Sequence, residues 1–208
     1  MVVRHSLATE FSHRHRSQGR RKIKMSGLLE ETLAKYNRGL VFVYTGNGKG
    51  KTTAAMGQAL RAVGHGLKVL VIQFMKGKKY GEVIACEKFL PAITICPCGL
   101  DSFVMRGNPA PVDIDLAQQG LNLARKSLSS GEYNMVILDE INVALDFGLV
   151  SVTDVVEMIK GRATNVDVVM TGRYAPPEII DIADTVSEVN EVKHHYSTGL
   201  KERAGIEY

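Results

Sequence analysis

The segment LVFVYTGNGKGKTT, residues 40–53, determines the fold class that the sequence predicts. Residues 40–44 are a continuous run of apolar and β-branched side chains, the pattern of a strand that is buried on both faces. The following glycine-rich turn can direct its amides at a phosphate group, and Lys51 and Thr52 add a positive charge and a hydroxyl that can bind a metal ion. A helical pattern begins at Thr52. Although Thr45 stands where the G-x-x-x-x-G-K-[ST] pattern has its first glycine, the order of strand, turn and helix predicts a phosphate-binding loop.

Further along the chain, apolar runs alternate with helical patterns. We expect strands at residues 68–74, 92–96, 134–138, 166–170 and 186–189. We expect helices at 28–37, 52–64, 81–90, 113–128 (with Asp113 as its N-cap) and 151–160, and a last one that starts at Pro176-Pro177. Residues 97–112 are rich in proline and glycine and should form a long loop, which in a compact domain is usually functional. This alternation predicts a three-layer α/β/α fold of the P-loop NTPase type around a mostly parallel central sheet.

The composition is that of a globular protein with one domain. A chain of 208 residues can bury one substantial core, and its 45% hydrophobic content excludes a disordered chain. Its three cysteines do not make a disulfide framework and favour a reducing compartment, so we expect a cytoplasmic protein. No apolar run reaches the roughly 18 residues that a membrane-spanning helix needs.

Positive charge is concentrated at the start of the chain. Residues 1–24 hold seven Lys and Arg residues against Glu10 alone, so they carry +6, whereas the whole chain carries +4. Such a segment can bind nucleic acid, an anionic membrane or a polyanionic small molecule. We therefore divide the chain into a basic N-terminal extension, residues 1–27, and a single domain, residues 28–208.

Charged residues at two other strand ends extend the candidate site. Asp139 and Glu140 follow the strand at 134–138, and Arg173 follows the strand at 166–170. Because parallel strands end at the same edge of a sheet, either carboxylate could hold a metal ion beside the phosphate loop. Arg173, and Arg61 in the helix after the loop, are candidates for contact with phosphate.

These residues leave more than one function open. The loop fits an ATPase or small-molecule kinase that cleaves the β–γ bond, a transferase that uses ATP in another way, or a nucleotide-switched protein whose basic extension binds nucleic acid. Cys96 and Cys98 have no second Cys/His pair at ligand spacing, so we expect no zinc site. No nucleophile elbow is present either. The chemistry is therefore expected to come from bound nucleotide and metal.

Eight stretches of the sequence, taken in order, resemble one family of enzymes. They are GNGKGKTT at 46–53, RAVGHG at 61–66, VIQFMKG at 71–77, LDE at 138–140, TGR at 171–173, ADTVSE at 183–188, VKH at 192–194 and GIEY at 205–208. Together they resemble the P-loop type of ATP:corrinoid adenosyltransferase, which acts on cob(I)alamin or cob(I)yrinic acid a,c-diamide. The resemblance spans residues 39–208, and the threonine at the start of the loop is itself a family trait.

The resemblance implies a transferase with ATP as co-substrate and Mg²⁺ or Mn²⁺ as cofactor. In the family, a cobalt(I) corrinoid attacks C5′ of ATP and expels the triphosphate, and ATP lies along the loop in reversed polarity. The product is the coenzyme form of vitamin B12. The implied catalytic residues are Lys51, Thr52 and Glu140, and the implied metal site comprises Thr52, Glu140 and Asp139. The implied nucleotide-binding residues are Gly46, Asn47, Gly48, Lys49, Gly50, Lys51, Thr52, Thr53, Arg61 and Arg173.

The resemblance also implies a corrinoid-binding loop. Relatives carry a Phe and, two residues on, a Trp; here Phe103 matches, but Met105 replaces the Trp. Methionine keeps an apolar contact and loses the large flat surface, so we expect a preference for corrinoids without a bulky lower base. The family implies a homodimer and an electron-donating reductase or flavodoxin, and we expect neither nucleic acid nor a membrane as partner. The basic extension takes the place of a helix that covers the family's active site, so we expect it to act as a lid.

Overall fold

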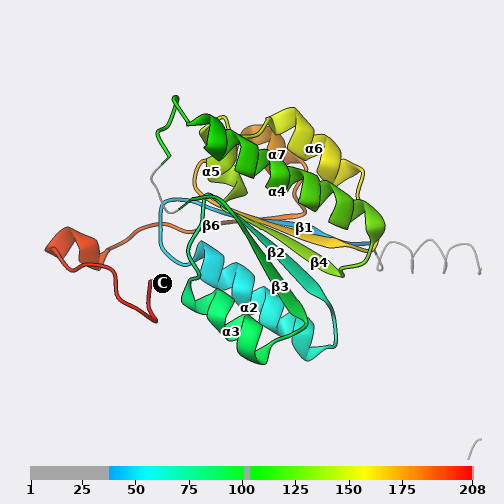
Figure 1. The fold of residues 1–208 in the computed structure, drawn as a ribbon, viewed down its shortest axis with the longest axis horizontal. Coiled ribbons are helices and arrows are strands. Elements are labelled where there is room, and N and C mark those ends of the chain that lie inside the picture. The colour runs from blue at the N-terminus through cyan, green and yellow to red at the C-terminus, as the bar shows by residue number, and fades with distance from the viewer. Residues whose placement is uncertain (1–37, 101–103, 208) are drawn as a thin grey trace, which may run out of the picture. The chain divides into compact units, whose positions relative to one another are not determined.

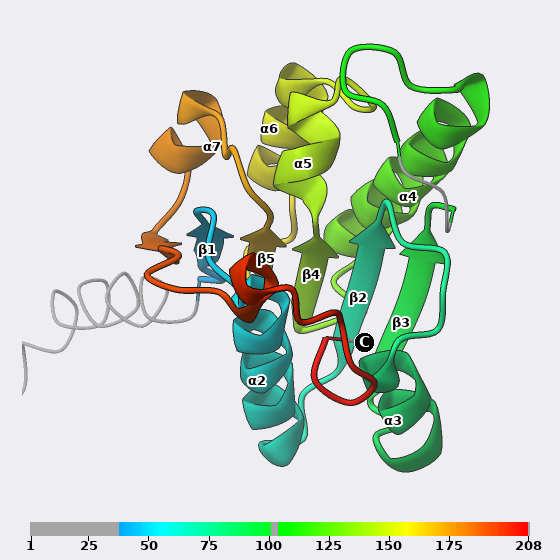
Figure 2. The same ribbon diagram turned by 90° about the vertical axis from the view of Figure 1, so that its left-hand side faces the viewer.

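A six-stranded parallel sheet forms the centre of the computed structural model, which describes residues 38–100 and 104–207 (Figure 1 and Figure 2). The strands are β1 (Val41–Thr45), β2 (Val69–Phe74), β3 (Ile93–Cys98), β4 (Met135–Asp139), β5 (Asp167–Thr171) and β6 (Thr185–Glu188). Their order across the sheet is β3-β2-β4-β5-β1-β6, and all neighbouring strands run parallel. The expected parallel sheet is confirmed.

Helices cover both faces of this sheet (Figure 1). On one face lie α2 (Lys51–Gly64) and α3 (Gly81–Phe89), which share an apolar cluster with the strands. On the other face lie α4 (Pro111–Ser130), α5 (Ile141–Asp146), α6 (Val152–Lys160) and α7 (Pro177–Asp181), which share a second, larger cluster. The predicted three-layer α/β/α architecture is therefore confirmed.

The burial of the strands follows their apolar content. All residues of β2 and β4 are buried, because these strands lie inside the sheet and helices cover both of their faces. All four residues of β6, at the edge of the sheet, are exposed. The most apolar runs of the sequence thus lie at the centre of the sheet, where the core is formed.

Four strands place polar residues at one edge of the sheet. The phosphate loop follows β1, Lys76 follows β2, Glu140 follows β4, and Arg173 follows β5. In open parallel sheets, ligands bind outside the carboxyl ends of the strands. This edge is therefore where the fold assembles the candidate site.

Two local predictions are wrong. Pro97 and Cys98, expected in the long loop, end β3 instead; β3 is an edge strand, and the missing N–H of a proline is tolerated at a sheet edge. Asp113, expected as the N-cap of a helix, lies at its third position, where its carboxylate accepts a hydrogen bond of 3.2 Å from the amide of Ala110. Helix α5 and the short 3₁₀-helix η1 (His195–Thr198) were not expected, because both are too short to give a periodic pattern.

Some of the predicted features lie outside the described residues. These are the basic extension, the helix at 28–37 and Phe103. Within residues 38–100 and 104–207, no helix combines the length and apolar character that crossing a membrane requires.

Candidate nucleotide site

The phosphate loop is held by the chain that follows β6. The amide of Gly48 donates a hydrogen bond of 2.7 Å to the carbonyl of Val189. A Cβ atom on Gly48 would approach the backbone of Asn190 to 2.8 Å, and Gly46, with φ of +91°, also lies against Val189. Glycine is thus required at both positions, because the loop must pass this close to a second backbone.

Lys51 begins α2 and directs its ammonium group back into the loop. The side chain is buried, and Nζ donates a hydrogen bond of 2.7 Å to the carbonyl of Gly48. Burial lowers the pKa of Lys51 and the nearby Arg173 lowers it further, while Glu140 and Asp139 oppose the change. A buried cation whose hydrogen-bond partner is a neutral carbonyl is well prepared to receive an anionic phosphate.

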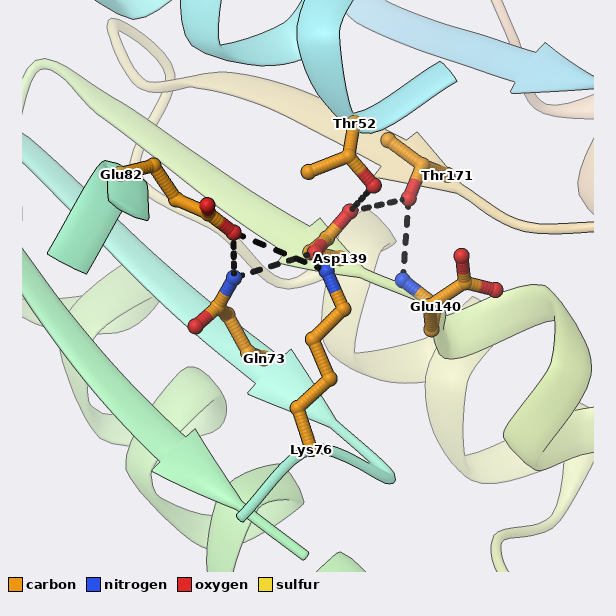
Figure 3. Close-up of polar contacts among 7 residues, drawn as sticks. All are labelled: Thr52, Gln73, Lys76, Glu82, Asp139, Glu140 and Thr171. Atoms are coloured by element: carbon orange, nitrogen blue, oxygen red, sulfur yellow. Dashed lines mark hydrogen bonds and ion pairs between the residues drawn. The ribbon is translucent and has the colours of Figure 1, made fainter. Parts of the chain in front are cut away.

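Asp139, the last residue of β4, is the centre of a buried polar network (Figure 3). Its Oδ1 accepts hydrogen bonds from the hydroxyls of Thr52, at 2.8 Å, and Thr171, at 2.7 Å. Its Oδ2 accepts hydrogen bonds from Nζ of Lys76, at 2.8 Å, and Nε2 of Gln73, at 3.4 Å. The carboxylate is fully buried and both oxygens are engaged by the protein, so its direct effect is to fix the Thr52 hydroxyl.

Lys76 neutralises this buried carboxylate. Burial lowers the pKa of Lys76, but the charge and hydrogen bond of Asp139, with Glu140 and Glu82 nearby, outweigh it, and the pKa is raised. Gln73 links the same network to Glu82 through a hydrogen bond of 3.1 Å. Sequence reasoning assigned no part in the site to Gln73 or Lys76. The available signals were that Gln73 is a polar residue in an otherwise apolar strand, and that both residues lie in the family-like stretch at 71–77.

Glu140 faces the site with an unengaged carboxylate. Its backbone is left-handed, with φ of +60°, and its amide donates a hydrogen bond of 2.9 Å to the hydroxyl of Thr171. Figure 3 shows the carboxylate turned away from Asp139, and it makes no hydrogen bond or ion pair with the other described residues. Burial, and then the charge of Asp139, raises the pKa of Glu140, against the opposing effect of Lys76, Lys51 and Arg173. Such a carboxylate is available to a cation.

Lys51, Lys76 and Glu140 line one cavity of about 920 Å³. Its walls come from the phosphate loop, the start of α2, the segment after β2, the start of α3, the two strand ends that carry Glu140 and Arg173, and the C-terminal segment. The cavity therefore combines a phosphate loop, the buried ammonium of Lys51, the partly buried ammonium of Lys76 and the unengaged carboxylate of Glu140, which suits a nucleoside triphosphate with its metal.

Comparison with known proteins identifies the family of the chain that forms this cavity. The family model described as "ATP:corrinoid adenosyltransferase BtuR/CobO/CobP" matches residues 37–208. The chain belongs to this family. The corrinoid adenosyltransferase of Pseudomonas aeruginosa is 36% identical over 202 residues, 96% of this chain and 98% of that protein. The corrinoid adenosyltransferase of Escherichia coli K12 is 37% identical over 176 residues, 84% of this chain and 88% of that protein.

The fold of this chain was also compared with solved structures. The RadB recombinase matches with a TM-score of 0.47 and 14% identity, covering 76% of this chain and 77% of that one.

The structure brings most of the residues implied by the family resemblance together. Asn47, Gly48, Lys49, Gly50, Lys51, Thr52, Thr53, Glu140 and Arg173 all line the cavity. Arg61 does not: it is exposed in the last turn of α2, and at 1.5 Å per residue it lies roughly 13 Å along the helix from Thr52. Met105 is 68% exposed and is also not among the lining residues.

The C-terminal segment, residues 189–207, closes one side of the adenosyltransferase cavity, which the sequence did not predict. Nζ of Lys49 donates a hydrogen bond of 3.1 Å to the carbonyl of Ile206 and lies 3.7 Å from the carboxylate of Glu207. That carboxylate also lies 3.4 Å from Nε2 of His195. Figure 2 shows the segment, in red, crossing in front of the start of α2. In this structure the ammonium of Lys49 is therefore held by the C-terminal segment, through the carbonyl of Ile206 and the side-chain carboxylate of Glu207.

We expect Glu140→Gln to raise the free energy of unfolding at neutral pH. The folded-state pKa of Glu140 is raised, so the folded protein binds this proton more tightly than the unfolded chain. The stability that this tighter proton binding adds to the folded state is fully present below the ordinary carboxyl pKa of about 4.3, and it is lost as pH rises through the folded-state pKa of Glu140. Above that pKa, the buried ionised group destabilises the protein. Urea unfolding in EDTA at neutral pH and near pH 4 measures the effect.

The Glu140→Gln variant should thus be more stable than the wild type at neutral pH, and the difference should shrink toward pH 4. Glu157→Gln, on the exposed side of α6, is the matched control and should leave the pH dependence unchanged. Equal stability of wild type and Glu140→Gln at neutral pH would show that the buried carboxylate carries no such cost.

Proposed function

We propose that the protein transfers the 5′-deoxyadenosyl group of ATP to the cobalt(I) centre of a corrinoid and releases triphosphate. The observation that carries this proposal is a phosphate loop opening into a cavity of about 920 Å³, in a chain that belongs to the ATP:corrinoid adenosyltransferase family. In the reaction, a bond forms between cobalt and C5′, the C5′–O bond breaks, and the triphosphate leaves with the electron pair. Cobalt(I) carries no proton, so the site needs no general base.

Lys51 and the phosphate loop stabilise the leaving group in this proposal. Negative charge grows on the triphosphate as the C5′–O bond breaks, and groups that meet this charge lower the barrier. Lys51 exchanges its contact with the Gly48 carbonyl for phosphate oxygens, and Arg173, which also lines the cavity, adds a second cation. Lys49 also lines the cavity and binds phosphate once it leaves Ile206 and Glu207.

The oxygen groups beside the loop suit Mg²⁺, which prefers carboxylate, hydroxyl and water ligands. The Thr52 hydroxyl and the unengaged Glu140 carboxylate would hold the ion, and Asp139 would act on it through Thr52, because both of its oxygens already accept hydrogen bonds from the protein. A bound Mg²⁺ would neutralise charge on the triphosphate. Because Mn²⁺ takes the same oxygen ligands, the site also suits that ion.

An anaerobic assay tests the proposed reaction. Purified protein is mixed with chemically reduced cobalamin or cobinamide and MgATP, the loss of cobalt(I) absorption is followed, and the phosphate product is identified. We expect a light-sensitive adenosylcorrinoid and one triphosphate for each cobalt(I) consumed. ADP and phosphate, with cobalt(I) decaying no faster than without protein, would instead establish an ATPase.

Three further features belong to the same proposal. The protein works as a homodimer, a reductase or flavodoxin donates the electron that reduces the corrinoid cobalt to cobalt(I), and the protein acts in the cytoplasm. Family membership and the absence of a disulfide among the described cysteines support these points. Sedimentation of the purified protein tests the dimer, and an assay that replaces the chemical reductant with a reduced flavodoxin tests the electron donor.

We expect Met105→Trp to improve cobalamin as a substrate relative to cobinamide. Met105 is exposed at the described end of the corrinoid-binding loop and lacks the flat surface that a Trp offers to a displaced lower base. The measurement is the ratio of kcat/KM for the two corrinoids. Wild type should favour cobinamide, and Met105→Trp should move the ratio toward cobalamin. Met56→Trp cannot serve as the control, because Met56 packs against the core and the larger side chain would disturb it. Equal ratios in wild type and variant would contradict a role for this position in lower-base recognition.

A further inference from the structure

Arg106 connects the corrinoid-binding loop to two segments of the nucleotide site. Its Nη2 donates a hydrogen bond of 2.6 Å to Oδ1 of Asp146, and its guanidinium lies over the ring of Tyr174, 5.3 Å from the ring centre. Asp146 is the last residue of α5, and the first residue of that helix directly follows Glu140. Tyr174 directly follows Arg173. One side chain thus contacts both of the segments that carry these cavity-lining charges.

The turn that carries Tyr174 is itself hydrogen-bonded to the end of β1, the strand that leads into the phosphate loop. The amide of Ala175 donates a hydrogen bond of 3.3 Å to the hydroxyl of Thr45, and the amide of Gly172 donates one of 3.2 Å to the carbonyl of Tyr44. Tyr174 is held with φ of +63°, a conformation that non-glycine residues adopt only where their surroundings hold them. The turn that Arg106 contacts is therefore held by hydrogen bonds to the strand that leads directly into the loop that would bind ATP.

Arg106 and Val104 hold Met105 from both sides. Val104 packs against the larger apolar cluster, and Arg106 is fixed by Asp146 and Tyr174. Met105, between them, is 68% exposed. With both of its neighbours anchored, Met105 presents an apolar side chain to solvent next to Arg106, which contacts Tyr174, the residue after the cavity-lining Arg173.

We propose that Arg106 is a positioning residue for the corrinoid. It fixes the loop that presents Met105 relative to the nucleotide cavity, so that the apolar contact meets the corrin ring where C5′ of ATP is exposed. Holding two reactants at a fixed separation is a large source of rate enhancement, and a loop that moves away from the cavity loses it. This inference rests on the proposed adenosyltransferase function.

Arg106→Met tests the inference, because it keeps the length of the side chain and removes both contacts. We expect the KM for the corrinoid to rise roughly 3- to 30-fold, the range that one exposed ion pair and one cation–π contact allow, while the KM for ATP changes less than about 2-fold. Arg106→Lys, which keeps a charge for Asp146, should fall between wild type and Arg106→Met. Arg125→Met is the matched control: Arg125 is exposed on α4, donates a hydrogen bond of 3.1 Å to Asn122 one turn away, and should behave as wild type.

Variants of the two partners separate positioning from direct contact. Asp146→Asn and Tyr174→Leu each leave Arg106 in place but weaken its anchorage, so positioning predicts a raised corrinoid KM in both. Tyr174→Phe keeps the ring and should behave as wild type. If Arg106 instead touched the corrinoid directly, Arg106→Met would raise the KM while Asp146→Asn and Tyr174→Leu would not, and the proposal would be overturned.

Two more outcomes would also overturn it. One is an unchanged corrinoid KM in Arg106→Met. The other is a rise in the KM for ATP as large as the rise in the KM for the corrinoid, which would mean that Arg106 acts on the nucleotide site as a whole. Thermal melting shows whether each variant is folded. If Arg106→Met does not fold, the corrinoid KM of Tyr174→Leu tests the proposal in its place. Wild type that consumes cobalt(I) and makes adenosylcorrinoid keeps the proposed function intact whatever these variants do.

Discussion

Lys51→Met lowers kcat/KM for adenosyl transfer by roughly 10²–10³-fold, the loss typical when one preorganised donor to a developing charge is removed. Lys51 is buried, and Nζ points into the phosphate loop beside the cavity. The lost interaction strengthens as the triphosphate departs, so kcat falls along with kcat/KM. Steady-state kinetics with cobinamide and varied ATP measures both values.

The control for this prediction is Lys79→Met. Lys79 is exposed, makes an ion pair of 2.6 Å with Glu87 and does not line the cavity, so its removal should leave both constants within about 2-fold. A Lys51→Met protein that kept its kcat and only raised the KM for ATP would mean that Lys51 binds the ground state and the transition state equally.

Asp139→Asn destabilises the protein by about 3–5 kcal/mol, the cost of breaking a buried ion pair by removing one charge. Asp139 is fully buried and accepts hydrogen bonds from Thr52, Thr171 and Lys76. The substitution leaves the ammonium of Lys76 largely buried without its counter-charge. Urea denaturation monitored by circular dichroism measures the change in the free energy of unfolding.

A double variant tests whether the uncompensated charge causes this loss. Asp139→Asn combined with Lys76→Met removes both charges and should recover part of the stability, because no unpaired ammonium remains. Asp115→Asn, at an exposed position of α4, is the control and should lie within about 0.5 kcal/mol of wild type. Strictly additive effects of the two substitutions would show that the ion pair contributes nothing beyond its separate members.

The sequence predicted those parts of the site that depend on neighbouring residues. Glycines, Lys51 and Thr52 stand within a few positions of one another after a buried strand, so the phosphate loop is encoded locally. Glu140 could be placed because it ends an apolar run, and parallel strands end together. Arg61 was also assigned from proximity in sequence, but the straight path of α2 carries it away from the cavity.

The parts that sequence reasoning did not predict arise from contacts between distant segments. Lys76 reaches Asp139 across 63 residues, and Lys49 reaches Ile206 across 157. Nothing in the local pattern of either lysine indicates such a partner, because the partner is fixed by strand order in the sheet and by the path of the C-terminal segment. Arg106 likewise meets Asp146 only because α5 ends beside the loop.

The position of β1 in the sheet has a consequence for how the protein is made. β1 is flanked by β5 and β6, and among the described residues it pairs with no strand that precedes residue 167. A ribosome that has synthesised the phosphate loop must therefore add more than a hundred residues before the strand that leads into it gains its first neighbour. Contacts of such long sequence separation form slowly and leave an apolar strand unpaired meanwhile. The nucleotide site is thus completed late in synthesis, and a nascent chain that stops before β5 carries the loop sequence without the loop.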